Sequence, residues 1–171
     1  MKNGRLVLVV GPSGAGKDTV LAYAKTHLAH YPQCVFVKRT ITRPPGPGED
    51  YESVTEAAFA QRRFALSWSA HGLHYGIPAE IETELAAGKT VIANVSRAVL
   101  PAARKTYNCI VIEITAPIEV LAKRLAARGR ETEEDITARL TRNAAPADAD
   151  ITIINDGLPE EAGAMFLAKL S

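Results

Sequence analysis

Short apolar runs alternate with amphipathic segments along the whole chain. Residues 5–10 form a β-branched apolar run that stops at Gly11-Pro12, which predicts a buried, central strand. Residues 17–28 carry apolar side chains at helical spacing and predict a helix. Further strands are predicted at 34–39, 64–69, 90–95, 109–115 and 150–154. Further helices are predicted at 56–59 behind a Thr55 cap, at 77–87, at 97–105, from a Thr115 cap to about Ala127, at 132–140 and from Pro159.

This alternation predicts an α/β fold in which helices cover both faces of a parallel sheet. Three prolines and two glycines between Thr40 and Gly48 exclude a regular element there and predict a stiffened loop. Residues 38–80 as a whole are richer in turn-forming and aromatic residues than the rest of the chain. We therefore expect this section to be an insertion on the sheet and not part of the sheet itself.

The composition narrows the classes of function. The 171 residues suffice for one domain with its own hydrophobic core. The 20 basic and 19 acidic residues give a formal net charge of +1, which argues against a nucleic-acid partner. The longest aliphatic run near the N-terminus, 6–10, is too short for a membrane span or a signal peptide. Cys34 and Cys109 lie outside any metal-ligand pattern, so we expect two reduced thiols in a cytoplasmic protein.

One glycine-rich segment has the pattern of a loop that binds the phosphates of a nucleotide. Gly11-Pro-Ser-Gly-Ala-Gly-Lys-Asp18 lies between a predicted strand and a predicted helix. Its glycines let successive backbone N–H groups turn inward, the helix N-terminus adds positive potential, and Lys17 can reach the β- and γ-phosphates of a nucleotide. A turn that only reverses the chain needs neither this spacing nor the lysine. The residues expected to bind ATP here are Gly11, Pro12, Ser13, Gly14, Ala15, Gly16, Lys17, Asp18 and Thr19.

Asp18 occupies the position at which such loops usually carry a Ser or Thr whose hydroxyl binds magnesium. Thr19 follows, but a helix turns about 100° per residue, so its hydroxyl should point elsewhere. A carboxylate oxygen also suits a hard cation, and we expect Asp18 to bind Mg²⁺ directly or through a water. The alternative is that Asp18 only stabilises the helix N-terminus through the macrodipole.

Further motifs resemble those of the guanylate kinase family over most of the chain. They are Thr42-Arg-Pro-Pro-Gly-Pro-Gly-Glu49, His74-Tyr-Gly76, Ala86-Ala-Gly-Lys89, Arg124-Leu-Ala-Ala-Arg-Gly129 and Ile154-Asn-Asp156, in the family's order. The resemblance implies a P-loop NTPase with the three-layer parallel sheet of nucleoside-monophosphate kinases. It also implies a single domain divided into a core (1–36, 81–125 and 146–171), an acceptor-binding insertion (37–80) and a lid (126–145).

Three departures from the guanylate kinase pattern argue against GMP as the acceptor. Ile77 stands where the family has a Ser or Thr that helps to bind the guanine. The stretch Ala65-Leu-Ser-Trp68 lacks the family's guanine-reading carboxylate, and Asn94 replaces an acidic residue. A site built to hydrogen-bond a base loses most of its discrimination without these groups.

The chain is also similar to the ribose 1,5-bisphosphate phosphokinases of phosphonate utilisation, in the loop at 11–18 and in segments 70–80 and 94–101. This resemblance implies transfer of the ATP γ-phosphoryl group to the 1-phosphate of ribose 1,5-bisphosphate, giving 5-phospho-α-D-ribose 1-diphosphate and ADP, with Mg²⁺ as cofactor. An ionised phosphate oxygen needs no general base, and the motifs contain no convincing one. The residues expected to bind the acceptor are Arg39, Arg43, Tyr51, His71, Tyr75, Asn94 and Arg97.

Arginines in and before the expected lid have either a catalytic role or a place on a solvated helix surface. We expect Arg128, Arg139 and Arg142 to act with Lys17 in catalysis, because a closing lid brings guanidinium groups to the transferring phosphoryl. Arg124 is interpreted instead as part of a solvated basic helix face that pairs with nearby acids. Asn155, after the last predicted strand, is expected near the adenine, although Asn155-Asp156 also makes an adequate turn on its own.

Two other hypotheses stay open on the sequence alone. One is a guanylate kinase or another nucleoside- or sugar-phosphate kinase of the same fold. The other is a guanylate-kinase-like binding module that has lost catalysis, although such a module needs neither Lys17 nor an arginine-rich lid. The sequence leaves the oligomeric state open, with a homodimer as one possibility, and gives no sign of a nucleic-acid or membrane partner.

Overall fold

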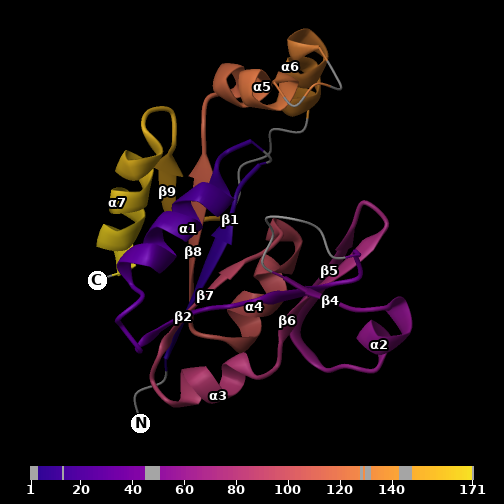
Figure 1. The fold of residues 1–171 in the computed structure, drawn as a ribbon, viewed down its shortest axis with the longest axis vertical. Coiled ribbons are helices and arrows are strands. Elements are labelled where there is room, and N and C mark those ends of the chain that lie inside the picture. Colours follow the sequence, from indigo (N-terminus) through magenta and orange to yellow (C-terminus); the bar gives the residue numbers. More distant parts are fainter. Residues whose placement is uncertain are drawn as a thin grey trace. The chain divides into compact units, whose positions relative to one another are not determined.

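The computed structural model of the chain describes residues 4–12, 14–44, 51–127, 129, 132–142 and 148–170, without the side chains of Arg139 and Arg142. Strands and helices alternate along it (Figure 1). In chain order they are β1 (Arg5–Val10), α1 (Lys17–His27), β2 (Cys34–Phe36), β3 (Arg39–Ile41), β4 (Tyr51–Ser53), α2 (Glu56–Ala60), β5 (Phe64–Ala70), β6 (Leu73–Pro78), α3 (Ile81–Ala86), β7 (Thr90–Asn94), the 3₁₀ turn η1 (Arg97–Val99), α4 (Leu100–Thr106), β8 (Cys109–Thr115), α5 (Ile118–Ala126), α6 (Glu133–Arg142), β9 (Ile151–Ile154) and α7 (Pro159–Leu170). No helix in the described part of the chain is long and apolar enough to cross a membrane.

Five strands form one sheet in the order β2-β7-β1-β8-β9. β1 is its central strand, and residues 6–10 are at most 1% exposed, as the apolar run predicts. β2 pairs with β7 in parallel, and β8 pairs with β9 in parallel. Parallel neighbours need a crossover connection, which explains why helices separate these strands along the sequence. The predicted α/β fold with a parallel sheet is confirmed.

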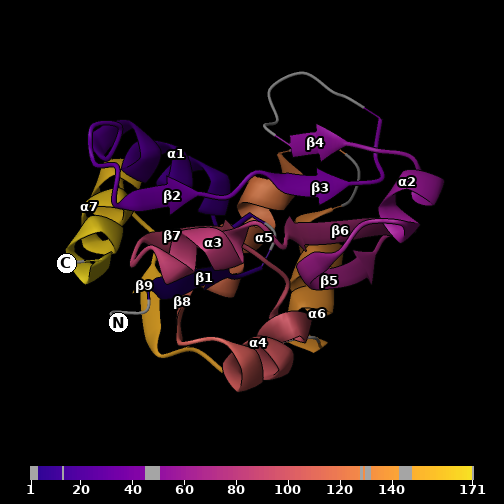
Figure 2. The same ribbon diagram turned by 90° about the horizontal axis from the view of Figure 1, so that it is seen from below.

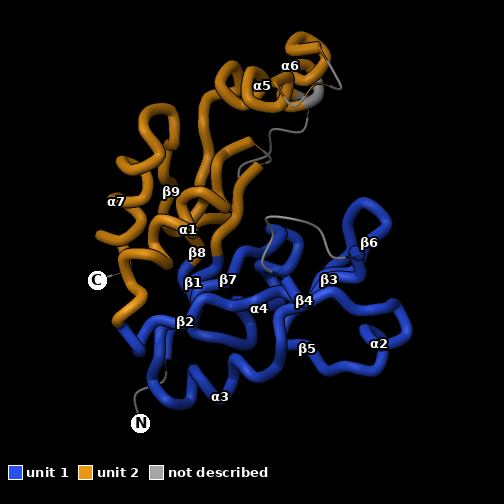
Figure 3. The backbone as a smooth tube through the Cα atoms, viewed as in Figure 1, with its two compact units in different colours: residues 1–8, 31–110 blue, residues 9–30, 111–171 orange. Residues whose placement is uncertain are grey.

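The chain forms two compact units, drawn in different colours in Figure 3. Unit 1 contains residues 1–8 and 31–110, and unit 2 contains residues 9–30 and 111–171. The boundary between the units therefore passes through β1 and β8. The predicted division into core, insertion and lid follows other boundaries and stays a prediction.

Unit 1 contains a second sheet, in which four strands lie in the order β4-β3-β6-β5 (Figure 2). β3 pairs with β4 in parallel, whereas β6 runs antiparallel to both β3 and β5. Ile41, Leu66 and Ile77 are buried in these strands. Because residues 39–78 supply all four strands, the expected insertion is a small sheet of its own.

Unit 2 contains the phosphate-loop segment and helices α1, α5, α6 and α7. α1 packs against α7, where Phe166 is fully buried, and α5 packs against α6, where Ile136 is 2% exposed. β8 and β9 contribute Ile112, Ile114 and Ile153 to the same core.

Two sequence-based predictions in unit 1 are wrong. The loop expected from Thr40 onward starts later, because Thr40 and Ile41 are fully buried in β3. The helix expected from Ile77 begins at Ile81, because Ile77 and Pro78 belong to β6. Proline disfavours a helical conformation in the residue before it, so Ile77 is extended. The predicted Thr55 cap is correct, since its hydroxyl accepts a hydrogen bond from the Ala58 N–H (3.1 Å).

The start of α5 also differs from the prediction. Thr115 is the last residue of β8, and the cap position of α5 is Pro117, which makes no side-chain cap bond. Thr115 still has a role at this point, because its carbonyl accepts a hydrogen bond from the Asn155 N–H (2.7 Å). A residue predicted to cap a helix therefore ties β8 to the segment after β9.

Candidate functional site

The glycine-rich segment has the setting predicted for a phosphate-binding loop. β1 ends at Val10 and α1 begins at Lys17, with the loop between them. Gly16 precedes the helix in a left-handed conformation (φ +85°), and no side chain caps this helix N-terminus. The N–H groups of the first turn therefore keep the positive potential that favours an anion. Ser13 lies outside the described residues, and the role of the loop as ATP ligand stays a prediction.

Two glycines let the loop approach its neighbours closely. A Cβ atom on Gly11 would collide with the carbonyl oxygen of Ile114 in β8. A Cβ atom on Gly16 would lie 2.5 Å from Nδ2 of Asn155. Both positions have a positive φ, which side-chain-bearing residues rarely adopt. The loop is thus pressed between β8 and the segment after β9, and both contacts depend on the missing side chain.

Lys17, Asp18 and Thr19 open helix α1. The ammonium of Lys17 is half-buried and donates a hydrogen bond to the Gly11 carbonyl (2.7 Å). Asp18 and Thr19 are exposed in the first turn. Mg²⁺ is usually held by one or two carboxylates together with substrate phosphates and waters, and a single exposed carboxylate next to the loop fits this donor set. Among the described residues there is no group of three or more His, Cys, Asp or Glu that could hold a metal alone.

Arg124 contacts the phosphate loop, a contact that sequence reasoning missed. It lies in the last turn of α5, and its guanidinium donates to two main-chain carbonyls, those of Gly14 (3.0 Å) and Asn155 (2.7 Å). The interpretation as a solvated helix face is therefore wrong. The only sequence signal was a basic residue at a helix C-terminus, where carbonyl groups lack partners, and that signal does not reveal a partner 110 positions away.

Asn155 faces the loop. Its side-chain amide donates to the Ala15 carbonyl (2.8 Å), and the residue is only 4% exposed. Its Oδ1 is buried without a hydrogen-bond partner in the described part of the chain. A buried acceptor in that state costs about 1–3 kcal/mol unless it is satisfied, so it suits a site that a polar group enters. The expected position near the adenine stays a prediction, while the observed contact is with the phosphate loop.

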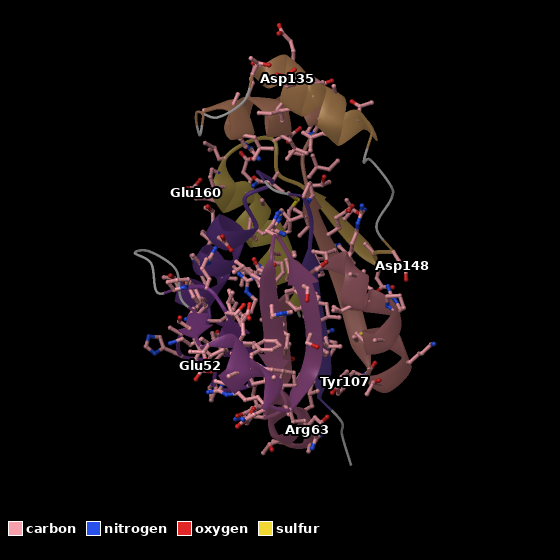
Figure 4. All side chains as sticks on the ribbon, turned by 90° about the vertical axis from the view of Figure 1, so that its right-hand side faces the viewer. Glu52, Arg63, Tyr107, Asp135, Asp148 and Glu160 are labelled. Atoms are coloured by element: carbon pink, nitrogen blue, oxygen red, sulfur yellow. The ribbon has the colours of Figure 1, made fainter. Side chains whose placement is uncertain are left out.

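The structure describes the predicted lid arginines only in part. Arg128 lies outside the described residues, and Arg139 and Arg142 lie in α6 with undescribed side chains. The first turn of α6 carries Glu133, Glu134 and Asp135, all exposed. Asp135 is labelled on α6 in Figure 4. Acids at a helix N-terminus complement the macrodipole, which explains why this helix begins here. The catalytic role of the three arginines stays a prediction.

Four of the expected acceptor residues meet in the second sheet of unit 1. Arg39 is opposite Tyr51 in the β3–β4 pair, and Ile41 is opposite Tyr75 in the β3–β6 pair. The Arg39 guanidinium lies 5.8 Å from the Tyr75 ring centre, and that of Arg43 lies 4.7 Å from the Tyr51 ring centre. The Arg43 Nε also donates to the Tyr51 hydroxyl (3.3 Å). Two guanidinium groups and two phenols, the groups that bind phosphate oxygens, are therefore close together.

Thr40 and Glu52 also connect β3 and β4, next to Arg39 and Tyr51 in the two strands. Glu52, labelled in Figure 4, is opposite Thr40 in the β3–β4 pair and accepts a hydrogen bond from its buried hydroxyl (3.1 Å). Arg62 binds both carboxylate oxygens of Glu52. The hydrogen bond from Arg62, followed by that from Thr40, lowers the pKa of the Glu52 carboxyl despite some desolvation.

The remaining expected acceptor residues lie elsewhere in unit 1. His71 is exposed in the tight turn between β5 and β6, with φ +53°. Asn94 is the last residue of β7, and Arg97 is the exposed first residue of η1. η1 contacts β5, so the segment carrying Arg97 reaches the second sheet. This contact is with β5, at one end of the strand order of the second sheet, whereas His71 occupies a position that the turn itself explains.

Apolar and aromatic side chains pair across β5 and β6. Ile77 is fully buried and lies opposite Leu66 in the β5–β6 pair. Trp68 stacks on Tyr75, with ring centres 5.4 Å apart and an interplanar angle of 3°. Neither Ile77 nor Leu66 offers a hydrogen bond to a purine. The argument from the sequence that GMP is a poor acceptor stays a prediction.

Comparison with known proteins gives a consistent result. The guanylate kinase family model matches residues 3–165. Ribose 1,5-bisphosphate phosphokinase PhnN from Acidiphilium cryptum is 57% identical, over 99% of this chain and 93% of that protein. The protein of the same name from Methylobacterium radiotolerans is 50% identical, over 98% and 97%. A crystal structure of guanylate kinase from Anaplasma phagocytophilum has a TM-score of 0.70 at 18% identity, covering 99% of this chain and 85% of that one.

Proposed function

Because the chain belongs to the guanylate kinase family and, within it, to the ribose 1,5-bisphosphate phosphokinases, we propose that it converts ribose 1,5-bisphosphate and ATP into 5-phospho-α-D-ribose 1-diphosphate and ADP in phosphonate breakdown. The observation that carries this proposal is the 57% identity over 99% of the chain to a protein with that name. The chain is therefore a kinase, an enzyme that uses ATP. The identity of the acceptor is supported by the names of the relatives and by the residues of the second sheet in unit 1.

The reaction forms one bond and breaks one. An oxygen of the acceptor's 1-phosphate attacks the γ-phosphorus of ATP, and the bond from that phosphorus to the β–γ bridging oxygen breaks, so ADP leaves. The attacking oxygen is already ionised at neutral pH, and no proton has to be removed. The protein's contribution is therefore alignment and neutralisation of negative charge.

Lys17 and the first turn of α1 act on the donor in this proposal. The Lys17 ammonium is held at the mouth of the loop by the Gly11 carbonyl, where it would meet the β- and γ-phosphates. Asp18 is the residue we propose to hold Mg²⁺, which when bound neutralises charge on the transferring phosphoryl. Arg128, Arg139 and Arg142 are proposed to add positive charge from the lid.

Unit 1 supplies the acceptor-binding residues. We assign one phosphate of the bisphosphate to Arg39, Arg43, Tyr51 and Tyr75, because two guanidinium forks and two hydroxyls suit a dianion. Asn94 and Arg97 are assigned to the second phosphate, because η1 contacts the same sheet. His71 is proposed as a peripheral contact. The cytoplasmic location and the homodimer remain predictions from the sequence.

Guanylate kinase activity is the alternative within the same fold. It is disfavoured because Ile77 is buried in the sheet and offers no hydrogen bond to guanine. A binding module without catalysis is disfavoured because the loop keeps Lys17 and its supporting contacts.

Measurement of ADP release with four acceptors tests the proposal. We expect turnover with ribose 1,5-bisphosphate and little with ribose 5-phosphate, AMP or GMP. The Lys17→Ala variant, purified identically, controls for contaminating kinases. Strong turnover with GMP and none with the bisphosphate would overturn the assignment, and failure to bind ATP at all would favour the inactive module.

A further inference from the structure

Two side chains hold consecutive carbonyl groups of the phosphate loop. Arg124 binds the carbonyl of Gly14 and Asn155 binds the carbonyl of Ala15, at 3.0 and 2.8 Å. Arg124 also binds the main-chain carbonyl of Asn155 at 2.7 Å. The three contacts join α5, the phosphate loop and the segment after β9 into one closed network within unit 2.

The network fixes the direction of a loop N–H group. In a trans peptide the C=O of one residue and the N–H of the next point in opposite directions. Because Asn155 holds the Ala15 carbonyl, the Gly16 N–H is directed away from Asn155. Gly16 itself packs so closely on Asn155 that a Cβ atom would lie 2.5 Å from Nδ2, so the backbone of this peptide lies directly against the amide.

Three hydrogen bonds hold Asn155 in place. Its N–H donates to the Thr115 carbonyl at the end of β8, its carbonyl accepts from Arg124, and its side chain donates to Ala15. Arg124 is half-buried, and within the described residues its guanidinium pairs with no carboxylate. A guanidinium whose two terminal nitrogens each donate to a different carbonyl is held in a defined orientation.

We propose that Arg124 and Asn155 are positioning residues for ATP, which set the phosphate loop in its binding conformation and hold it in register with the segment after β9. The proposal rests on the proposed function only in taking ATP as the donor. Arg124 acts through the Gly14 and Asn155 carbonyls, and Asn155 acts through the Ala15 carbonyl. Neither side chain needs to touch the reacting atoms.

Calorimetric titration of the full chain with ATP and with inorganic tripolyphosphate, in Mg²⁺ and without acceptor, tests the proposal. Arg124→Met and Asn155→Leu should each weaken ATP binding by about tenfold or more. Arg124→Lys should lose most of the same affinity, because one ammonium lacks the planar fork. Lys123→Met, on the exposed neighbouring position of α5, should stay within about twofold of the wild type. Wild-type affinity in Arg124→Lys would show that only charge matters and would overturn the proposal.

The double variant separates positioning from direct contact with ATP. If both residues act through one loop conformation, the loss in Arg124→Met with Asn155→Leu should be close to that of the worse single variant. Independent contacts with ATP would instead give losses that multiply, and this result would overturn the proposal. Both single variants should also bind tripolyphosphate more weakly. This ligand has no adenosine, and the loop is proposed to bind the phosphates.

Two further measurements distinguish a specific loss of ATP positioning from a general loss of stability. Hydrogen exchange of residues 11–17 should accelerate in Arg124→Lys while exchange in β1 stays slow. The KM for ATP should rise, and the KM for the acceptor should stay within about twofold of the wild type. Equal increases in both KM values would mean a merely structural role. Because binding is measured without acceptor, a wild type that binds ATP but does not phosphorylate the bisphosphate would refute the proposed function and leave this proposal standing.

Discussion

The ammonium of Lys17 lies 2.7 Å from the carbonyl oxygen of Gly11, so that the first residue of α1 is bonded to the first residue after β1. This bond closes the phosphate loop into a ring and holds a positive charge at its opening. The charge is half-buried, and in such surroundings it interacts with a phosphate more strongly than in bulk water.

Removal of that charge should abolish catalysis and preserve the fold. We expect Lys17→Ala to lower kcat by about a hundredfold or more, because the ammonium acts mainly on charge that develops in the transition state. Steady-state assays with the bisphosphate measure this, and circular dichroism checks the fold. Lys25→Ala, exposed on the same helix, is the matched control. A Lys17→Ala variant with near-normal kcat would show that the loop assignment is wrong.

Gly16 should tolerate no side chain. Gly16→Ala adds a Cβ that must displace the Asn155 amide and also adopts a positive φ, which costs about 1–2 kcal/mol. ATP affinity measured by calorimetry should therefore fall sharply. Gly72→Ala is the control, because Gly72 also has a positive φ (+75°) but a Cβ there meets nothing within 4 Å. If both variants lose the same stability and Gly16→Ala keeps its ATP affinity, the close approach to Asn155 is unimportant.

Arg97 should affect the acceptor more than the donor. Arg97→Gly removes a guanidinium from a segment that contacts the second sheet, and we expect the KM for ribose 1,5-bisphosphate to rise by about tenfold or more. The KM for ATP should change little. Initial rates with each substrate varied in turn give both constants. Equal changes in the two would assign Arg97 a structural role.

Glu52 should make stability depend on pH at the acid end. Its pKa is lowered in the folded state, chiefly by the hydrogen bond from Arg62, so its contribution is complete above the ordinary value of 4.5 and is lost as the pH falls through the folded-state pKa. The pair is largely exposed, so solvent screening should keep this contribution small. Urea unfolding should find Glu52→Gln less stable than the wild type at pH 7, with the difference vanishing at low pH. Arg62→Met should remove the same dependence, and a difference that persists at low pH would contradict the assignment.

Local patterns predicted much of the fold from the sequence. The apolar run at 6–10, the Gly16-Lys17 junction and the Thr55 cap depend on neighbours within a few positions, and all three appear as expected. The helix predicted from Ile77 is wrong for a local reason, because Pro78 favours an extended conformation in the residue before it.

The supporting network of the candidate site was beyond sequence reasoning. Arg124 reads as a surface residue because its spacing places it among charged neighbours, and nothing local reveals its contact with Gly14. Asn155 reaches Ala15 over 140 positions, and Glu52 is paired with Thr40 only because β3 and β4 are neighbours in a sheet. Such contacts follow from tertiary packing, which overrides local patterns.

The most direct test of the proposed reaction is ³¹P NMR of the wild-type protein with Mg²⁺, ATP and ribose 1,5-bisphosphate. We predict that the acceptor's 1-phosphate signal disappears and that two coupled diphosphate signals grow in step with ADP, while its 5-phosphate signal persists. Loss of ATP without new diphosphate signals from the sugar, or transfer to GMP and not to the bisphosphate in the same tube, would contradict the assignment.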